Sequence, residues 1–270
     1  MRTWSFVKGH GTRNDFVVFK DRSSMMRLTD ADVRFICDRR GGVGGDGLLR
    51  AVKAEHMPEW DGDPDLWFMD YRNADGSIAE MCGNGLRVFV RVLLDCDLVP
   101  LGPVSVATRA GLRVATPYPD GRIAVTMGPV VAAGELVAVT VGTPREGVQV
   151  SVGNPHAVVE VTPEAVADAD LTVAPHVPHE RYPDGANVEL AARVGERHYV
   201  MRVHERGVGE TESCGTGAVA VAYALGDGEP GSYRVDVPGG ALEVLVHDDG
   251  TASLVGPAVV VAKGEVSLPE

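Results

Sequence analysis

The sequence has few cysteines and few lysines, and it has no long apolar run. Its four cysteines lie far apart in 270 residues, which excludes a disulfide framework and leaves reduced thiols available for chemistry. Lysine occurs only at positions 8, 20, 53 and 263, and none of these settings indicates a Schiff base. No apolar run could span a bilayer, and the first residues lack the apolar segment of a secretory signal. We therefore expect a cytoplasmic protein.

Positive charge is also scarce. Lysine and arginine number 25 against 38 acidic residues, which gives a net charge of −13. The resulting field repels phosphate backbones and anionic lipid, and no basic cluster offsets it locally. Nucleic acid and membrane surfaces are therefore excluded as partners. Hydrophobic residues make up 44%, enough for a large core, and the length suits two domains.

Short, valine-rich segments dominate the predicted secondary structure. Most are bounded by Gly, Pro or Asp turns, which is typical of strands. The predicted strands are residues 16–19, 66–69, 104–107, 123–127, 148–152, 157–161, 199–203, 233–237, 242–246 and 259–262. One predicted helix, residues 30–39, has Thr29 as its N-cap, acids in its first turn and arginines in its last.

Two further predicted helices, residues 86–94 and 218–225, are apolar nearly all round, so protein must surround them. Cys-Gly-Asn-Gly at 82–85 opens the first, and Cys-Gly-Thr-Gly at 214–217 opens the second. The cysteines are 132 residues apart, close to half the chain, which indicates an internal repeat. We predict an α+β fold of two pseudo-symmetric domains, each a curved, mostly antiparallel sheet wrapped around a central buried helix.

The boundary between the domains is expected near Thr116–Pro117. The N-terminal domain would be residues 1–116, with a final strand at about 258–270 returning to it, and the C-terminal domain 117–257. Duplicated halves usually pack about a pseudo-twofold axis. Such packing would allow the two helix N-termini to face each other.

A thiol at a helix start favours acid–base chemistry. The macrodipole and the unpaired backbone N–H groups there lower the pKa of a cysteine. Glycines after Cys82 and Cys214 leave those N–H groups open to a carboxylate. Two thiols beside a shared anion site suit inversion at a carbon, where one removes a proton and the other delivers one. A single Cys-Gly-x-Gly could be only a tight turn, and Cys37 and Cys96 are expected to be small buried hydrophobes.

Several segments, in order along the chain, resemble the diaminopimelate epimerase family. They are residues 8–16, 71–77, 80–87, 153–156, 187–189, 205–207 with 210–211 and 214–217, and 238–240. Ordered motifs that include both cysteines are more specific than one short motif. The resemblance implies interconversion of LL- and meso-2,6-diaminopimelate in lysine and peptidoglycan-precursor synthesis. It also implies a homodimer that uses neither pyridoxal phosphate nor metal.

The resemblance further assigns roles to residues. Cys82 is implied as proton donor and Cys214 as proton acceptor in the LL-to-meso direction, with His156 and Glu205 tuning the thiols. The backbone near Gly83 and Asn84, and near Gly215 and Thr216, is implied to bind the reacting carboxylate. The side chains implied to hold the substrate are Asn14, Asn73, Asn154, Asn187, Glu205 and Arg206.

The residue types suit a substrate with an amino acid at each end. Each asparagine offers donors and an acceptor to an ammonium–carboxylate pair, and Arg206 suits a distal carboxylate through its two-pronged donor geometry. Two positions depart from the family pattern. Arg13 stands where Gly or Glu is commoner, and Gly47 where some members carry a substrate-contacting Gln. Any contact from Gly47 would have to come from backbone or water.

Two alternatives remain open from the sequence. A proline or hydroxyproline racemase shares the two-cysteine logic, but that family resembles Cys-Gly-His where this chain has Asn84 after Gly83. A binding protein regulated by a disulfide between Cys82 and Cys214 would leave the asparagines and Glu205 without a role.

Overall fold

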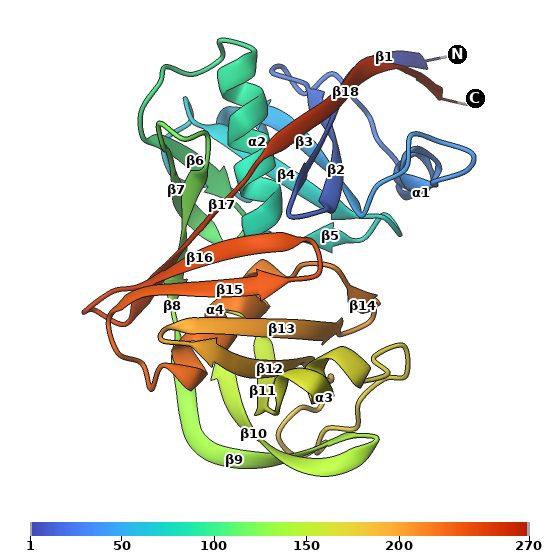
Figure 1. The fold of residues 1–270 in the computed structure, drawn as a ribbon. Helices are drawn as coiled ribbons and strands as arrows, with labels where there is room; N and C mark the ends of the chain where they lie inside the picture. The colour runs from blue at the N-terminus through green and yellow to red at the C-terminus, as the bar shows by residue number, and fades with distance from the viewer. Residues whose placement is uncertain (1, 269–270) are drawn as a thin grey trace. The chain divides into compact units, whose positions relative to one another are not determined.

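The computed structural model describes residues 2–268, with the backbone alone at 134–137. Contacts divide the chain into two compact units (Figure 1). The N-terminal unit runs up to Val125 and includes the segment from Pro257 onward, and the C-terminal unit is Thr126–Gly256. The sequence had placed the division near Thr116–Pro117; the contacts place it within strand β8, Ile123–Pro129.

The N-terminal unit is a mixed sheet that holds one long helix. Its strands are ordered β18-β1-β2-β3-β4-β6-β7-β8, with the short β5 beside β4. The pairs β2–β3 and β4–β6 are parallel, and the others are antiparallel. Its elements are β1 (Arg2–Gly11), β2 (Asn14–Lys20), α1 (Asp30–Cys37), β3 (Gly47–Lys53), a 3-10 turn (Ala54–His56), β4 (Trp67–Asn73), β5 (Ile78–Ala79), α2 (Gly83–Asp95), β6 (Val104–Thr108), β7 (Gly111–Pro117), β8 and β18 (Val259–Leu268).

The C-terminal unit repeats this plan. Its strands are ordered β9-β10-β11-β12-β13-β15-β16-β17, with β14 beside β13, and β11–β12 and β13–β15 are the parallel pairs. Its elements are β9 (Val131–Val141), β10 (Thr143–Ser151), β11 (Pro155–Glu160), α3 (Pro163–Asp168), β12 (Asn187–Gly195), β13 (His198–Glu205), β14 (Gly209–Thr211), α4 (Gly215–Leu225), β15 (Gly231–Val237), β16 (Gly240–Val246) and β17 (Thr251–Gly256).

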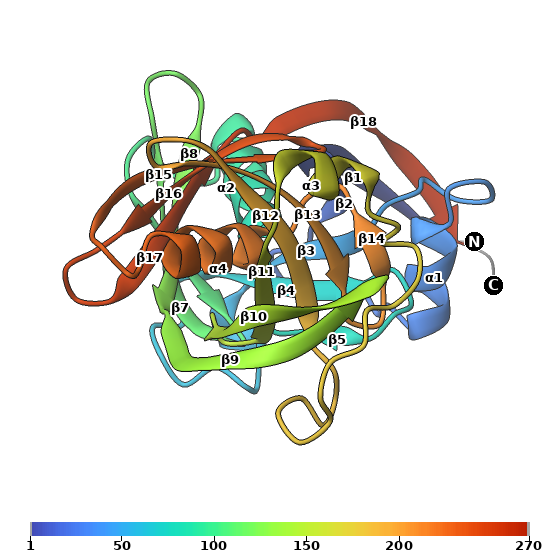
Figure 2. The same cartoon turned by 60° about the horizontal axis from the view of Figure 1, so that its bottom comes forward.

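The two units correspond element by element. The helices α2 and α4 each follow a short strand, β5 or β14, and each precedes a strand that pairs in parallel with its neighbour. Helix α2 packs against β1 and β2. Helix α4 packs against β11, β12, β13, β15 and β16, and Figure 2 shows it beside β11. The predicted fold of two repeated, mostly antiparallel domains around buried helices is confirmed.

Mostly apolar side chains produce this packing, although α2 also carries the ion pair Arg91–Asp95 near its C-terminal end. In α2, Leu86, Val88 and Phe89 are fully buried, and in α4 the run from Ala218 to Ala222 is fully buried. Packing each helix against its sheet removes apolar surface from water. This burial stabilises the fold by about 25 cal/mol for each Å². No helix among residues 2–268 is long and apolar enough to cross a membrane.

The sequence was less accurate for strands that are buried on both faces and for one helix end. The predicted ranges also omitted β1, β7, β9, β14 and β17. Strands β3 and β12 were missed because their residues are buried without the alternation that marks a half-exposed strand. Thr29 caps α1 as predicted, with a capping box to Asp32. The helix ends at Cys37 and not at residue 39, since Asp38 is extended and its carboxylate accepts the N–H groups of Arg40 and Gly41.

Candidate active site

Both catalytic candidates are N-cap residues. Cys82 is the N-cap of α2, and its sulfur accepts the backbone N–H of Gly85 at 3.3 Å. Cys214 is the N-cap of α4, and its sulfur accepts the N–H of Gly217 at 3.4 Å. Extended backbone at each cysteine followed at once by helix places each sulfur at the positive end of a helix dipole. A thiolate and a docked carboxylate both gain from that position.

Asparagines connect the group around Cys82, which we call the Cys82 cluster: Asn14, Asp46, Cys82, Asn84 and Arg87. The thiol of Cys82 donates to Asn14 Oδ1 at 3.6 Å, and Asn84 Nδ2 donates to the same oxygen at 3.3 Å. On its other side, Asn14 Nδ2 donates to Asp46 Oδ2 at 2.9 Å. The predicted residues Asn14, Cys82 and Asn84 are therefore in mutual contact.

Arg87 lies behind Asn84 and is fully buried. Its four hydrogen bonds all go to neutral oxygens. They are the carbonyls of Pro257 at 3.2 Å and Gly83 at 3.5 Å, Asn84 Oδ1 at 3.0 Å and Thr12 Oγ1 at 3.5 Å. Burial lowers the pKa of Arg87 to about 10, and a charge on Cys82 acts in the opposite direction. A Cβ at Gly11 would lie 2.9 Å from Arg87 Nη2 and 3.1 Å from the carbonyl oxygen of Asn84, so a larger residue there would displace the guanidinium.

A hydrogen-bonded chain leads to the second thiol and defines the Cys214 cluster. Glu189 Oε1 lies 2.7 Å from His156 Nδ1, and both side chains are fully buried. His156 Nε2 lies 3.0 Å from Asn154 Oδ1, and Asn154 Nδ2 donates to Thr216 Oγ1 at 3.3 Å. Thr216 Oγ1 is 3.4 Å from Cys214 Sγ. Both imidazole nitrogens thus face oxygen atoms, and a chain of polar contacts runs from Glu189 through His156 to Cys214.

Carboxylates give the Cys214 cluster a negative potential. Burial raises the pKa of Cys214 well above its usual value, and Glu205 and Glu189 add to the increase. Burial also raises the pKa of Glu205, although hydrogen bonds from Thr211 and from the Cys214 thiol favour its carboxylate. Cys214 and Glu205 can therefore share one proton, which either group can carry.

The remaining predicted residues stand at strand ends near these clusters. Asn73 ends β4 and lies opposite Gly47, the first residue of β3. Asn187 begins β12, and its Oδ1 accepts the backbone N–H of Arg206 at 2.9 Å, which fixes the turn after Glu205. Arg206 itself is exposed.

Both departures from the family pattern have structural settings. A Cβ on Gly47 would lie 2.7 Å from the carbonyl oxygen of Arg72 and 2.7 Å from the Tyr71 ring, so no longer side chain fits there without a backbone shift. Thr12 and Arg13 form the two-residue turn between β1 and β2, with φ of 50° and 63°. Such a turn favours Gly, Asn or Asp, and Arg13 adopts it with its side chain exposed.

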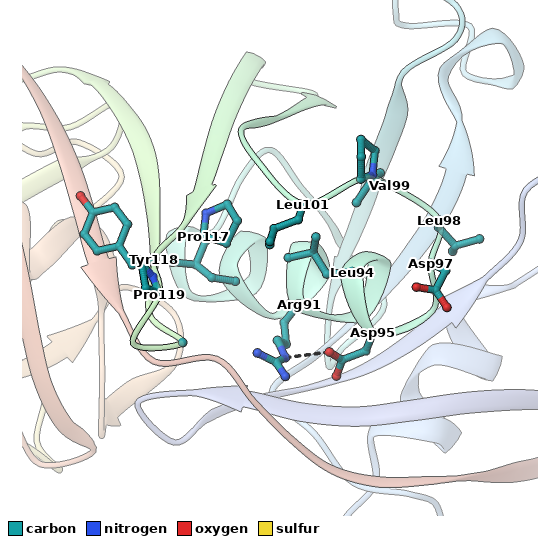
Figure 3. Close-up of a pocket in the computed structure, with 13 residues that line it drawn as sticks. Arg91, Leu94, Asp95, Asp97, Leu98, Val99, Leu101, Pro117, Tyr118 and Pro119 are labelled. Atoms are coloured by element: carbon teal, nitrogen blue, oxygen red, sulfur yellow. Dashed lines mark ion pairs between the residues drawn. The ribbon is translucent and has the colours of Figure 1, made fainter.

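A cavity of about 720 Å³ in the N-terminal unit lies away from the Cys82 cluster (Figure 3). Its walls are the C-terminal end of α2, the loop at 97–101 and the turn between β7 and β8. Arg91 and Asp95 form an ion pair of 2.9 Å at its edge. The 13 residues of α2 separate the C-terminal end of the helix from Cys82 by about 20 Å. None of the predicted site residues lines the cavity.

Sequence reasoning missed two buried ionic groups, Arg87 and Glu189. A signal for each was present. Arg87 is one of two arginines in a mostly apolar helix segment. Glu189 is on the same strand face as Asn187 because strand side chains alternate. Within the described part of the chain, no three His, Cys, Asp or Glu side chains are grouped so that they could hold a metal ion.

Comparison with known proteins agrees with the fold and the motifs. The family model for diaminopimelate epimerase matches residues 6–133 and 148–268. The diaminopimelate epimerase of Streptomyces coelicolor is 48% identical over 97% of this chain and 94% of its own, and that of Thermobifida fusca is 47% identical over 97% and 98%.

Solved structures share the fold at lower identity. A phenazine biosynthesis protein of the PhzF family from Bacillus anthracis matches with a TM-score of 0.74 at 16% identity, over 99% of this chain and 100% of that one. A hydroxyproline epimerase from Agrobacterium vitis matches with a TM-score of 0.70 at 15% identity, over 100% and 94%. The two matched segments of the family model and the identity over nearly the whole length lead to one conclusion: this chain belongs to the diaminopimelate epimerase family.

Proposed function

We propose that this protein is an isomerase that interconverts LL- and meso-2,6-diaminopimelate with two cysteine acid–base groups. The observation that carries the proposal is the pair of thiols, Cys82 and Cys214, each capping the buried helix of one repeated unit. From LL to meso, the Cys214 thiolate takes the α-proton, so a C–H bond breaks and an S–H bond forms. The Cys82 thiol then gives its proton to the opposite face of that carbon.

The helix starts supply the electrostatic help that this step needs. Backbone N–H groups near Gly83 and Asn84, and near Gly215 and Thr216, would bind the reacting carboxylate. They also stabilise the negative charge that develops when the α-proton leaves. His156 and Glu205 tune Cys214 through the contacts described above.

Amide side chains and Arg206 would hold the rest of the substrate. Diaminopimelate carries an amino acid at each end, so inversion of one centre requires a grip on the other. The side chains proposed for this grip are Asn14, Asn73, Asn154, Asn187, Glu205 and Arg206. The exposed Arg206 suits the distal carboxylate through two parallel hydrogen bonds.

The chemistry places the enzyme in lysine and peptidoglycan-precursor synthesis. Because the thiols supply both the acid and the base, the proposal requires no pyridoxal phosphate. All four cysteines are free, and the mechanism needs two of them reduced, which supports a cytoplasmic location.

Isomerisation in deuterated water tests the proposal. Purified protein incubated with LL-diaminopimelate, without added cofactor, should form the meso isomer with one solvent deuterium at the inverted α-carbon. Chiral chromatography with mass spectrometry measures both quantities. Inversion of proline or hydroxyproline without inversion of diaminopimelate would overturn the substrate assignment.

We further propose that the enzyme is a homodimer formed through β18. Among the described residues, β18 pairs only with β1, so its other edge is available. The strand exposes Val259 (42%) and Val261 (55%). Antiparallel pairing of two copies about Gly264 would set Lys263 opposite Glu265 of the partner subunit, and symmetry would repeat that pair. Opposite charges across strands favour such pairing.

A charge exchange tests the dimer. Lys263→Glu should weaken association by at least about tenfold, because two attractive cross-strand pairs become repulsive. The double variant Lys263→Glu with Glu265→Lys should restore it. Analytical ultracentrifugation gives the dissociation constants. A dimer that both variants leave unchanged would place the interface elsewhere, and a monomeric wild-type protein would exclude the dimer.

A further inference from the structure

The repeated units place different residues beneath the two thiols. In the parallel register of the N-terminal unit Phe16 lies beside Gly47, and in that of the C-terminal unit His156 lies beside Asn187. Phe16 thus occupies the position of His156, and by the same register Leu49 occupies that of Glu189.

The glycines one turn into each helix show the same contrast. A Cβ on Gly85 would meet Phe16 at 3.4 Å and Leu49 at 3.5 Å. A Cβ on the equivalent Gly217 would meet Glu189 Oε1 at 2.7 Å. The floor under the helix start is therefore apolar at Cys82 and ionic at Cys214.

The two helices also differ in a buried positive charge. Arg87 is five residues after Cys82, and the residue five after Cys214 is the fully buried Val219. Within residues 2–268 no carboxylate forms an ion pair with Arg87, whose acceptors are all neutral oxygens. An ionised side chain in a protein interior is costly unless an opposite charge compensates it. The group whose charge acts favourably on Arg87 is Cys82.

We propose that Arg87 is a positioning residue that stabilises the thiolate of Cys82, and that Cys82 ionises before Cys214 in the free protein. Arg87 acts in two ways. Its charge favours a sulfur anion at the start of its own helix, and its hydrogen bond to Asn84 holds the amide that contacts Asn14. The repeated backbone thus carries two thiols of unequal acidity.

The other charged groups around each thiol support this order. Facing Cys82 from the sheet is the neutral Asn14, and behind it lies Asp46. Asp46 and the neighbouring Asp15 both pair with Arg39 at 2.7 Å, and Asp15 also pairs with Lys8, so two cations accompany the two carboxylates. Facing Cys214 are Glu205 from β13 and Glu189 from β12, with His156 from β11 pairing Glu189. Burial and those two acids raise the pKa of Cys214, so its thiol form is favoured.

This inference rests on the proposed function and adds to it the protonation state of the free enzyme. With Cys82 as thiolate and Cys214 as thiol, the enzyme is prepared for the isomer whose α-proton Cys82 removes. With the roles proposed above, that isomer is meso-diaminopimelate. The reverse form must be regenerated by proton exchange with solvent before LL-diaminopimelate can react.

Alkylation of the free protein across a range of pH tests the proposal without substrate. Iodoacetamide reacts with thiolates, and peptide mass spectrometry measures each cysteine separately. The pH midpoint reports the ionisation of a thiol, whereas the plateau rate reports its accessibility. We expect the midpoint of Cys82 to lie at least about one pH unit below that of Cys214. Cys37, whose pKa burial raises to about 11, serves as an internal reference.

Two substitutions separate charge from packing. Arg87→Met should raise the Cys82 midpoint by about one unit or more and leave the Cys214 midpoint in place. Arg87→Lys keeps the charge and should restore most of the difference. A merely structural role would disturb both thiols alike. If Arg87→Met does not fold, the order of the two midpoints in the wild-type protein and the Cys82 midpoint in Arg87→Lys still test the proposal.

Two outcomes would overturn the proposal. One is a Cys214 midpoint at or below that of Cys82 in the wild-type protein, and the other is an unchanged Cys82 midpoint in folded Arg87→Met. Because no substrate is present, these outcomes are independent of the diaminopimelate assay. A protein that inverts diaminopimelate but ionises Cys214 first would retain the proposed function and lose this inference.

Discussion

Replacing either Cys82 or Cys214 by alanine is expected to reduce diaminopimelate inversion by roughly 10²- to 10⁴-fold or more, the usual contribution of one acid–base group. In the proposed mechanism each thiol serves one face of the reacting carbon, so loss of either leaves inversion without its acid or its base. In the Cys82 cluster, Asn14 and Asn84 are neutral and Arg87 is a cation. The carboxylate of Asp46 contacts Asn14 on the side away from the thiol, so we expect none of these groups to replace Cys82 as the base.

The remaining thiol gives each variant a distinct signature. A single thiol can remove an α-proton and return a deuteron to the same face, which exchanges hydrogen without inversion. In deuterated water, Cys82→Ala should therefore label LL-diaminopimelate through Cys214, and Cys214→Ala should label the meso isomer through Cys82. Mass spectrometry of the separated isomers measures both.

Cys96→Ala supplies the matched control, because Cys96 caps the opposite end of the same α2 helix. It should retain near-wild-type inversion. Inversion that persists at near-wild-type rate in either catalytic alanine variant would exclude the two-thiol mechanism. Equal labelling of both isomers by both variants would contradict the assignment of one face to each thiol.

Replacing Glu189 by alanine is expected to destabilise the protein by about 3–5 kcal/mol, the usual cost of removing one partner from a buried ion pair. His156 and Glu189 are both fully buried and lie 2.7 Å apart, so the variant leaves the imidazole Nδ1–H without an acceptor. Urea unfolding followed by circular dichroism measures the free energy of unfolding. Glu196→Ala, at an exposed turn of the same unit, should change it by less than about 0.5 kcal/mol.

The N-terminal unit suggests a double variant that should restore the stability lost in Glu189→Ala. At the equivalent positions the N-terminal unit carries Phe16 and Leu49. The double variant His156→Phe with Glu189→Leu should recover most of the stability, because Glu189 Oε2, which has no hydrogen-bond partner among the described residues, is removed with the pair. It should remain poorly active, since Asn154 and Thr216 lose the histidine that holds them. A Glu189→Ala protein as stable as the wild type would contradict this prediction.

The sequence was sufficient for the outline of this protein. Two apolar helices, each preceded by Cys-Gly-x-Gly, implied the repeat, the buried position of both helices and the helix-start setting of both thiols. These features are local: a helix without a polar face has to be enclosed, and a residue just before it has to be its cap. The ordered motifs likewise placed the chain in its family.

Other features depended on contacts between residues far apart in the chain. Strands β3 and β12 lack alternation because both faces are covered, and a pattern of period two cannot reveal them. Gly47 must be glycine because the β4 backbone approaches it closely, a fact of strand packing and not of the local sequence.

The difference in acidity between the two thiols also depends on contacts between residues far apart in the chain. In sequence the two Cys-Gly-x-Gly segments are almost interchangeable, and the helix dipole treats both sulfurs alike. Arg87 acts on Cys82 because the chain folds Thr12 and Pro257 around its guanidinium. Glu189 and His156 act on Cys214 because parallel pairing brings β11 and β12 together beneath α4. Electrostatic energy depends on distance and burial, and both are set by tertiary packing. The identity of the two cysteines was therefore evident from sequence, while their unequal acidity arises only in the folded protein.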